Sequence, residues 1–181
     1  MRLGTIWKPG WGASSRGERR PMDRVREWAA SCFYLGEFPF ASGTVGSLGA
    51  VALYLIAALQ FDGLHLSLVA GGAGVLFALI GIAIGHWAQV HYKDRDPRQF
   101  VLDEAAGQLF ALVGVTPLLW ALPRWKVALA AFIFFRICDI IKPCPAGRAE
   151  RLNAGWGIVL DDIVAGIYAA ALTHVWFYFI A

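Results

Sequence analysis

The chain has 181 residues, of which 58% are hydrophobic and only 16% are charged, and its formal net charge is +3. Soluble domains are about 45–50% apolar and about 25% charged, so this composition excludes an ordinary soluble domain and a disordered chain. The three cysteines include no Cys-x-x-Cys pair and give no sign of a disulfide scaffold or a zinc site. Nothing in the charge pattern indicates a nucleic-acid partner.

Four long segments without a charged residue indicate a membrane protein. Asp, Glu, Lys and Arg are absent from residues 38–61, 63–92, 105–123 and 163–181. A helix that crosses a bilayer needs about 20 mostly apolar residues. We therefore predict an all-α, multi-pass membrane bundle. Its membrane helices, about five in number, are expected over residues 45–60, 66–90, 100–122, 127–141 and 158–181.

The N-terminal part is expected to differ from the rest. Residues 1–20 are mostly basic and are predicted to be a flexible arm. Residues 21–34 are expected to form an amphipathic surface helix, because Pro21 suits a first helical turn. Its apolar residues recur at helical spacing, at Val25, Trp28, Ala29 and Cys32. Residues 21–181 are predicted to form a single membrane-embedded domain.

Basic residues predict the orientation in the membrane. They concentrate in the N-terminal arm, in the loop at 93–98 and in the loop at 142–151. With five spans these segments fall on one side, which the positive-inside rule assigns to the cytoplasm.

Five carboxylates are predicted to lie at the cytoplasmic ends of three membrane helices, namely Asp103, Glu104, Asp139, Asp161 and Asp162. A charge inside a membrane segment costs roughly 2.5–3.5 kcal/mol on insertion scales, and these acids would also repel one another. A hard divalent cation such as Mg²⁺, which takes oxygen ligands, would neutralise them. Alternatively, acidic residues at helix starts interact favourably with the helix dipole, and Asp139 could form a structural pair with Arg136.

Two elements are suited to binding phosphate. Arg136, Asp139 and Lys142 share one helical face, where Arg and Lys could hold a phosphate group, although Lys142 could instead extend to the membrane interface. The run Gly43-Thr44-Val45-Gly46-Ser47 precedes an apolar helix, where free N–H groups and the hydroxyls of Thr44 and Ser47 would favour an anion. The alternative for this run is a capped helix with glycines for close packing.

Four segments in register resemble the motifs of the phosphatidylglycerophosphatase A family. The resemblance covers about residues 33–175 and lies in residues 36–48, in Asp96 with residues 101–107, and in residues 136–143 and 155–166. One departure is Ser42, where the family usually has proline before the Gly-Thr pair.

The resemblance implies a Mg²⁺-dependent lipid phosphatase of the bacterial inner membrane, acting at the cytoplasmic face on phosphatidylglycerophosphate. It also implies an all-α bundle with one central helix. Catalytic and metal-binding roles are expected for Asp103, Glu104, Asp139, Asp161 and Asp162. Substrate-binding roles are expected for Gly43, Thr44, Ser47, Asp96, Arg136 and Lys142. The rival interpretations are a membrane ion or proton carrier and a non-catalytic lipid-binding protein.

Overall fold

The structure, a computed structural model, describes residues 21–114, 117–145 and 155–180, and every regular element in these ranges is a helix. The helices are α1 (Pro21–Ala30), the 3-10 helix η1 (Leu35–Glu37), α2 (Ser42–Ala57), α3 (Gly63–Tyr92), α4 (Leu102–Ala111), α5 (Pro117–Ala121), α6 (Arg124–Ile141) and α8 (Gly155–Ile180). The all-α prediction is confirmed for this part of the chain. The predicted basic arm over residues 1–20 lies outside the described residues.

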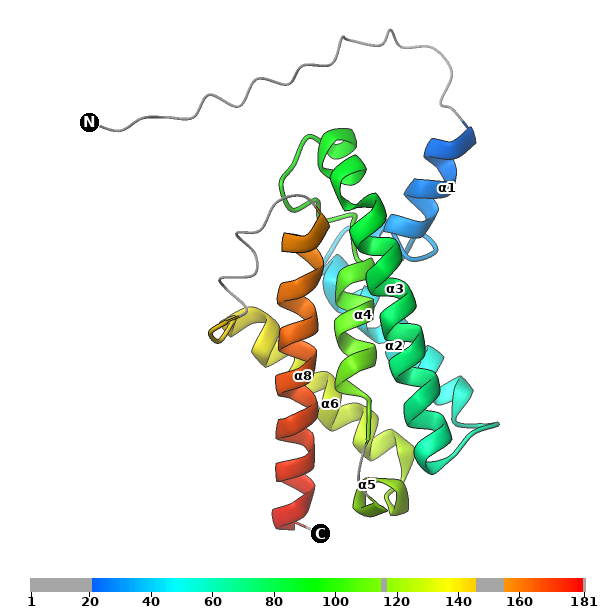
Figure 1. Cartoon of the computed structure of the whole chain (residues 1–181), viewed down its shortest axis with the longest axis vertical. Helices are drawn as coiled ribbons and strands as arrows, with labels where there is room; N and C mark the ends of the chain where they lie inside the picture. The colour runs from blue at the N-terminus through cyan, green and yellow to red at the C-terminus, as the bar shows by residue number, and fades with distance from the viewer. Residues whose placement is uncertain (1–20, 115–116, 146–154, 181) are drawn as a thin grey trace, which may run out of the picture.

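Helix α4 is the centre of the bundle and packs against α2, α3, α6 and α8 (Figure 1). Ala105, Ala106 and Gln108 on this helix have no exposed surface. The arrangement agrees with the single central helix that the family resemblance implies. Helix α4 begins at Leu102, so Asp103 and Glu104 belong to its first turn. The central position of α4 brings these two acidic residues into the bundle.

Glycines bring α8 close to both α3 and α4. A Cβ atom on Gly85 of α3 would lie 2.5 Å from the Cα atom of Gly155, which is the first residue of α8. A Cβ atom on Gly107 of α4 would lie 2.5 Å from the backbone oxygen of Asp162 on α8. Such approaches are typical of small residues at contacts between membrane helices, and they place Asp162 against α4.

Helix α1 confirms the predicted amphipathic helix, although it ends at Ala30. Met22, Val25 and Trp28 are exposed on one side, whereas Ala30 is fully buried. The inner side of α1 contacts the end of α3, where His91 Nε2 lies 3.1 Å from Glu27 Oε1 of α1.

Among the described residues, α3 and α8 are long and apolar enough to cross a membrane, with mean hydropathies of 2.3 and 1.7. Helix α2 is a shorter apolar helix of 16 residues. These features indicate a membrane protein. The number of spans and their orientation remain predictions.

The helices α3, α6 and α8 begin three residues before their expected starts, and two further differences bear on the site. The helix predicted over residues 100–122 is divided, since α4 ends at Ala111 and α5 begins at Pro117. Proline lacks an N–H group and disfavours helical backbone in the residue before it. The carbonyl of Gly114 in the break instead accepts hydrogen bonds from Ser67 Oγ and from Trp120 Nε1. With ten residues at about 1.5 Å each, α4 is too short to cross a bilayer by itself.

The second difference is that α2 begins at Ser42 and not near Val45. The glycine-rich run predicted to precede this helix therefore forms its first two turns. Ala41 before it has a φ of 50°, and the Ser42 hydroxyl donates a 2.6 Å hydrogen bond to the Arg98 carbonyl. This long-range contact fixes the start of the helix.

Candidate active site

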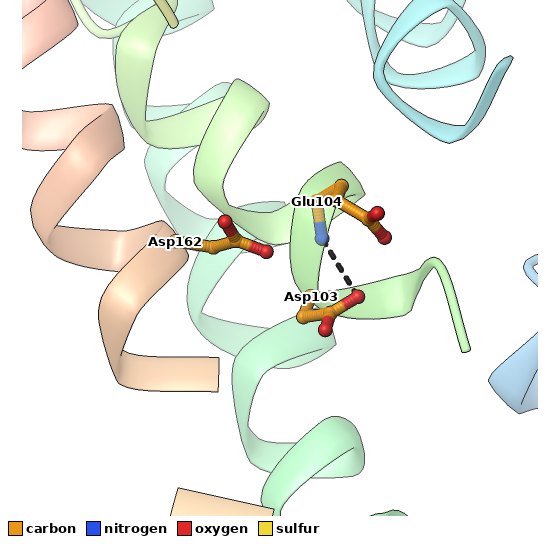
Figure 2. Close-up of side chains that lie close together, drawn as sticks. All are labelled: Asp103, Glu104 and Asp162. Carbon is orange, nitrogen blue, oxygen red and sulfur yellow. Dashed lines mark hydrogen bonds between the residues drawn. The ribbon is translucent and has the colours of Figure 1, made fainter. Parts of the chain in front are cut away.

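Three carboxylates from two helices meet in the interior (Figure 2). Asp103 and Glu104 belong to the first turn of α4, and Asp162 extends toward them from α8. One oxygen atom from each residue lies within 4.8 Å of the other two. Asp103 and Asp162 are each only 4% exposed, so this carboxylate cluster is shielded from water.

The backbone explains how two adjacent acids are held at the start of α4. Asp103 Oδ1 accepts a 2.9 Å hydrogen bond from the backbone N–H of Glu104, which orients the aspartate side chain. Acidic side chains in the first turn also interact favourably with the positive end of the helix dipole. Glu104 Oε2, in contrast, is buried and has no hydrogen-bond partner.

The carboxylate cluster fits a hard divalent cation. Its donor atoms are all carboxylate oxygens, which are the ligands that Mg²⁺ prefers. Three carboxylates at this separation repel one another, and Glu104 Oε2 is buried without a hydrogen-bond partner. A bound cation would relieve both costs.

The other two predicted acids are paired with basic side chains of α6 and of the residue that follows it. Asp139 Oδ2 lies 3.0 Å from Arg136 Nη1, and Asp161 Oδ2 lies 2.8 Å from Lys142 Nζ. Asp139 also lies beside the carboxyl group of Asp162. The structure thus connects Asp139 to the cluster, whereas Asp161 is directed toward Lys142.

The start of α2 approaches the carboxylate cluster at a residue without a side chain. A Cβ atom on Gly43 would overlap Glu104 Oε1 and would lie 3.5 Å from Arg136 Nη1. Ser47, one turn further along α2, is fully buried, and its hydroxyl donates a 2.9 Å hydrogen bond to the Gly43 carbonyl. The Ser47 hydroxyl proton is therefore already used inside the helix. Ser47 thus helps to hold Gly43, and its role as a hydroxyl donor to the substrate stays a prediction.

Two predicted residues remain, Thr44 and Asp96. Thr44 is half-buried in the first turn of α2. Asp96 is exposed in the loop between α3 and α4, outside the carboxylate cluster, although its charge acts on Asp103 and Glu104.

Two further residues near the cluster were not identified from the sequence. Gln108, one turn beyond Glu104 on α4, is fully buried, and neither its Nε2 nor its Oε1 has a hydrogen-bond partner. An amide in a mostly apolar helix, four residues after an acid, is the signal that could have identified it. Burial raises the pKa of the Cys32 thiol to about 11, with a further contribution from the Glu104 charge, so this thiol is a packing group.

Comparison with known proteins gives a consistent result. The family model for phosphatidylglycerophosphatase A matches residues 28–177. A candidate phosphatidylinositol-3-phosphatase of Bacteroides thetaiotaomicron is 37% identical over 154 residues, covering 79% of this chain and 87% of that protein. Phosphatidylglycerophosphatase A of Escherichia coli is 33% identical over 146 residues, covering 78% of this chain and 77% of the relative. No solved structure matches the chain.

Proposed function

The chain belongs to the phosphatidylglycerophosphatase A family, so it is a lipid phosphatase, and we propose that its substrate is phosphatidylglycerophosphate. In this reaction a water oxygen bonds to the terminal phosphorus and the phosphorus–oxygen ester bond breaks. A proton reaches the leaving glycerol oxygen, and the products are phosphatidylglycerol and inorganic phosphate. The observation that supports this chemistry best is the buried cluster of Asp103, Glu104 and Asp162 close to Arg136.

We assign cation binding to the carboxylate cluster, with Asp139 beside it. A bound Mg²⁺ supplies positive charge that offsets the charge of the phosphoryl oxygens. A cluster carboxylate that does not hold the cation would accept the proton of the attacking water.

Arg136 is the group proposed to bind the phosphate. Its planar guanidinium can donate to two phosphate oxygens at once. It is paired with Asp139 in the structure, and the incoming phosphate would take over part of that pairing. Lys142 would add a second positive charge, and the backbone N–H groups at Gly43 and Thr44, in the first turn of α2, would add donors.

We propose that the site faces the cytoplasm from a bacterial inner membrane. The basic residues of the arm and of the loop at 93–98 support this orientation through the positive-inside rule. Labelling of single cysteines from the outer side tests it. A cysteine replacing Asp62, before α3, should react, and one replacing Asp94, after α3, should not. The reverse pattern would contradict the proposed orientation.

A second substrate class is suggested by the Bacteroides relative, whose name assigns it a phosphoinositide. Both lipids carry a phosphate monoester on a polyol headgroup, so the same carboxylate cluster and Arg136 would serve either. Purified protein in vesicles should be assayed with each lipid in turn. Faster phosphate release from phosphatidylglycerophosphate supports the first assignment, and faster release from phosphatidylinositol phosphate replaces it with the second.

The test of the catalytic assignment is phosphate release against Mg²⁺ concentration. Asp162→Asn retains the shape of the side chain but removes one anionic ligand, so the variant should need more Mg²⁺ or lose activity. Asp62→Asn is the matched control, because Asp62 is exposed at the opposite end of α3 and makes no side-chain cap. Equal Mg²⁺ dependence in wild type and Asp162→Asn would refute the assignment.

A further inference from the structure

The candidate site reaches the molecular surface along the end of α6. Asp103 and Asp162 are almost completely buried. The side chains of Arg136 and Lys142 are 21% and 31% exposed. A ligand coming from outside therefore meets these two cationic groups before it meets the carboxylate cluster.

The surface beside these cations is aliphatic. Ile137, Ile140 and Ile141 follow Arg136 on α6 and are 44%, 75% and 69% exposed. On α2, Leu48 follows the buried Ser47 and is 49% exposed. Exposed aliphatic side chains next to a charged opening are typical of a surface that binds a partner with an apolar part and a charged part.

Helices α2 and α6 meet at this position. Ser47 Oγ on α2 lies 3.5 Å from Arg136 Nη1 on α6. Leu48 is the next residue after Ser47, and Ile137 is the next residue after Arg136. We call the surface formed by Leu48, Ile137, Ile140 and Ile141 the α2–α6 seam. The exposed stripe of α6 continues from the seam to Ile133 and Leu129. The seam is therefore continuous with a long apolar face of the bundle.

We propose that the α2–α6 seam is the lateral entrance for the lipid substrate, whose acyl chains lie against the seam while its phosphate reaches Arg136. This inference rests on the proposed function and adds the route by which the lipid arrives. Withdrawing a two-chain lipid into water would expose all of its methylene groups, and a lateral entrance avoids this cost. The occupant is thus a lipid with a phosphate monoester headgroup, because only such a molecule matches both the aliphatic seam and the two cations.

Photo-crosslinking tests the entrance without any need for turnover. Cys144 is exposed, whereas Cys32 and Cys138 are buried, so a Cys144→Ser background permits selective labelling. A benzophenone maleimide is attached at Ile137→Cys or, as the matched control, at Ile167→Cys, which is 57% exposed on α8. Both proteins are placed with Mg²⁺ in phosphatidylcholine vesicles that contain a minor fraction of phosphatidylglycerophosphate, and the label is activated at once, before the lipid is hydrolysed.

The label at position 137 should capture phosphatidylglycerophosphate beyond its share of the bilayer, and the label at position 167 should capture lipids in proportion. Equal capture at both positions would overturn the entrance. Enrichment at 137 for phosphatidylinositol phosphate, but not for phosphatidylglycerophosphate, supports the entrance and refutes the proposed substrate. Crosslinking at 137 to a second copy of the chain, without lipid enrichment, would identify a dimer interface and overturn the entrance.

Kinetics give an independent readout. Ile137→Ser should raise KM for a long-chain substrate by roughly tenfold, because the contact of one aliphatic side chain is lost. KM for the same headgroup on short, water-soluble chains should rise much less. Ile167→Ser, an exposed position on α8, should change neither value. Equal increases for both chain lengths in Ile137→Ser would contradict a role in acyl-chain binding.

Discussion

Gly43→Ala should separate activity from stability. The added methyl group would overlap Glu104 Oε1 and lie 3.5 Å from Arg136 Nη1. The overlapping atom is the end of a flexible side chain, so Glu104 can move while the backbone stays in place. Alanine also favours a helix over glycine by about 0.5–1 kcal/mol, which offsets the cost of that movement. The free energy of unfolding should therefore change by less than about 1 kcal/mol.

The effect of Gly43→Ala on turnover should be much larger. A displacement of about 1 Å at a catalytic group can reduce the rate by about 100-fold. Phosphate release from lipid vesicles and thermal unfolding should be measured on the same preparation. Gly72→Ala is the matched control, since a Cβ atom on Gly72 of α3 would meet nothing within 4 Å. It should retain full activity and gain some stability. Full activity in Gly43→Ala would refute the proximity of α2 to the carboxylate cluster.

The other predictions concern Arg136, Gln108 and Gly85. Arg136→Lys should lose most of the phosphate release at unchanged protein levels, because a lysine cannot replace the two-pronged donor; wild-type turnover would show that Arg136 is structural. Gln108→Leu should leave the free energy of unfolding unchanged or raise it by up to about 1 kcal/mol, because two buried polar atoms without hydrogen-bond partners are removed. The melting temperature measures this change, and a lower value than in the wild type would show that the amide is hydrogen-bonded. Gly85→Ala should destabilise the protein by about 1–3 kcal/mol, because the methyl group of the alanine would lie 2.5 Å from the Cα atom of Gly155. Denaturant unfolding in detergent would measure this loss of stability.

Much of the architecture could be predicted from charge patterns alone. The long charge-free segments identified α2, α3 and α8. A helix that lies in a bilayer needs a long run of apolar residues, and this requirement can be recognised in any sequence. The acidic pair at Asp103 and Glu104 was recognised as the start of a helix, and the family motifs assigned it to a site. The resemblance implied one central helix but did not identify it as α4, because the composition of α4 does not distinguish it from the helices around it.

The orientation of adjacent acids could not be predicted. Asp161 and Asp162 are identical residues next to each other, and a helix turns by about 100° between them. The sequence pattern therefore leaves open which of the two faces α4. The structure resolves this through Gly107, whose close approach to the Asp162 backbone places that residue at the cluster and leaves Asp161 to pair with Lys142.

The start of α2 shows a different limit. Gly, Ser and Thr are typical of turns, so the run from Gly43 to Ser47 was expected to precede the helix. In the structure two tertiary contacts override this preference: Ser42 donates to the Arg98 carbonyl, and Gly43 lies against Glu104. Both partners are more than 50 residues away in the sequence, so local propensity contains no information about them.

The distribution of charge in the site predicts that a cation and the lipid would bind cooperatively. Asp139 and Asp161 each form an ion pair with a basic side chain. Among the described residues, Asp103, Glu104 and Asp162 form no ion pair within 4.0 Å, although the Arg136 charge acts on Glu104. A phosphate dianion that reaches Arg136 would approach three carboxylates of the same sign, and repulsion at this depth is screened little by solvent. A cation in the cluster would reverse that repulsion. By linkage, the factor by which Mg²⁺ strengthens lipid binding must equal the factor by which the lipid strengthens Mg²⁺ binding.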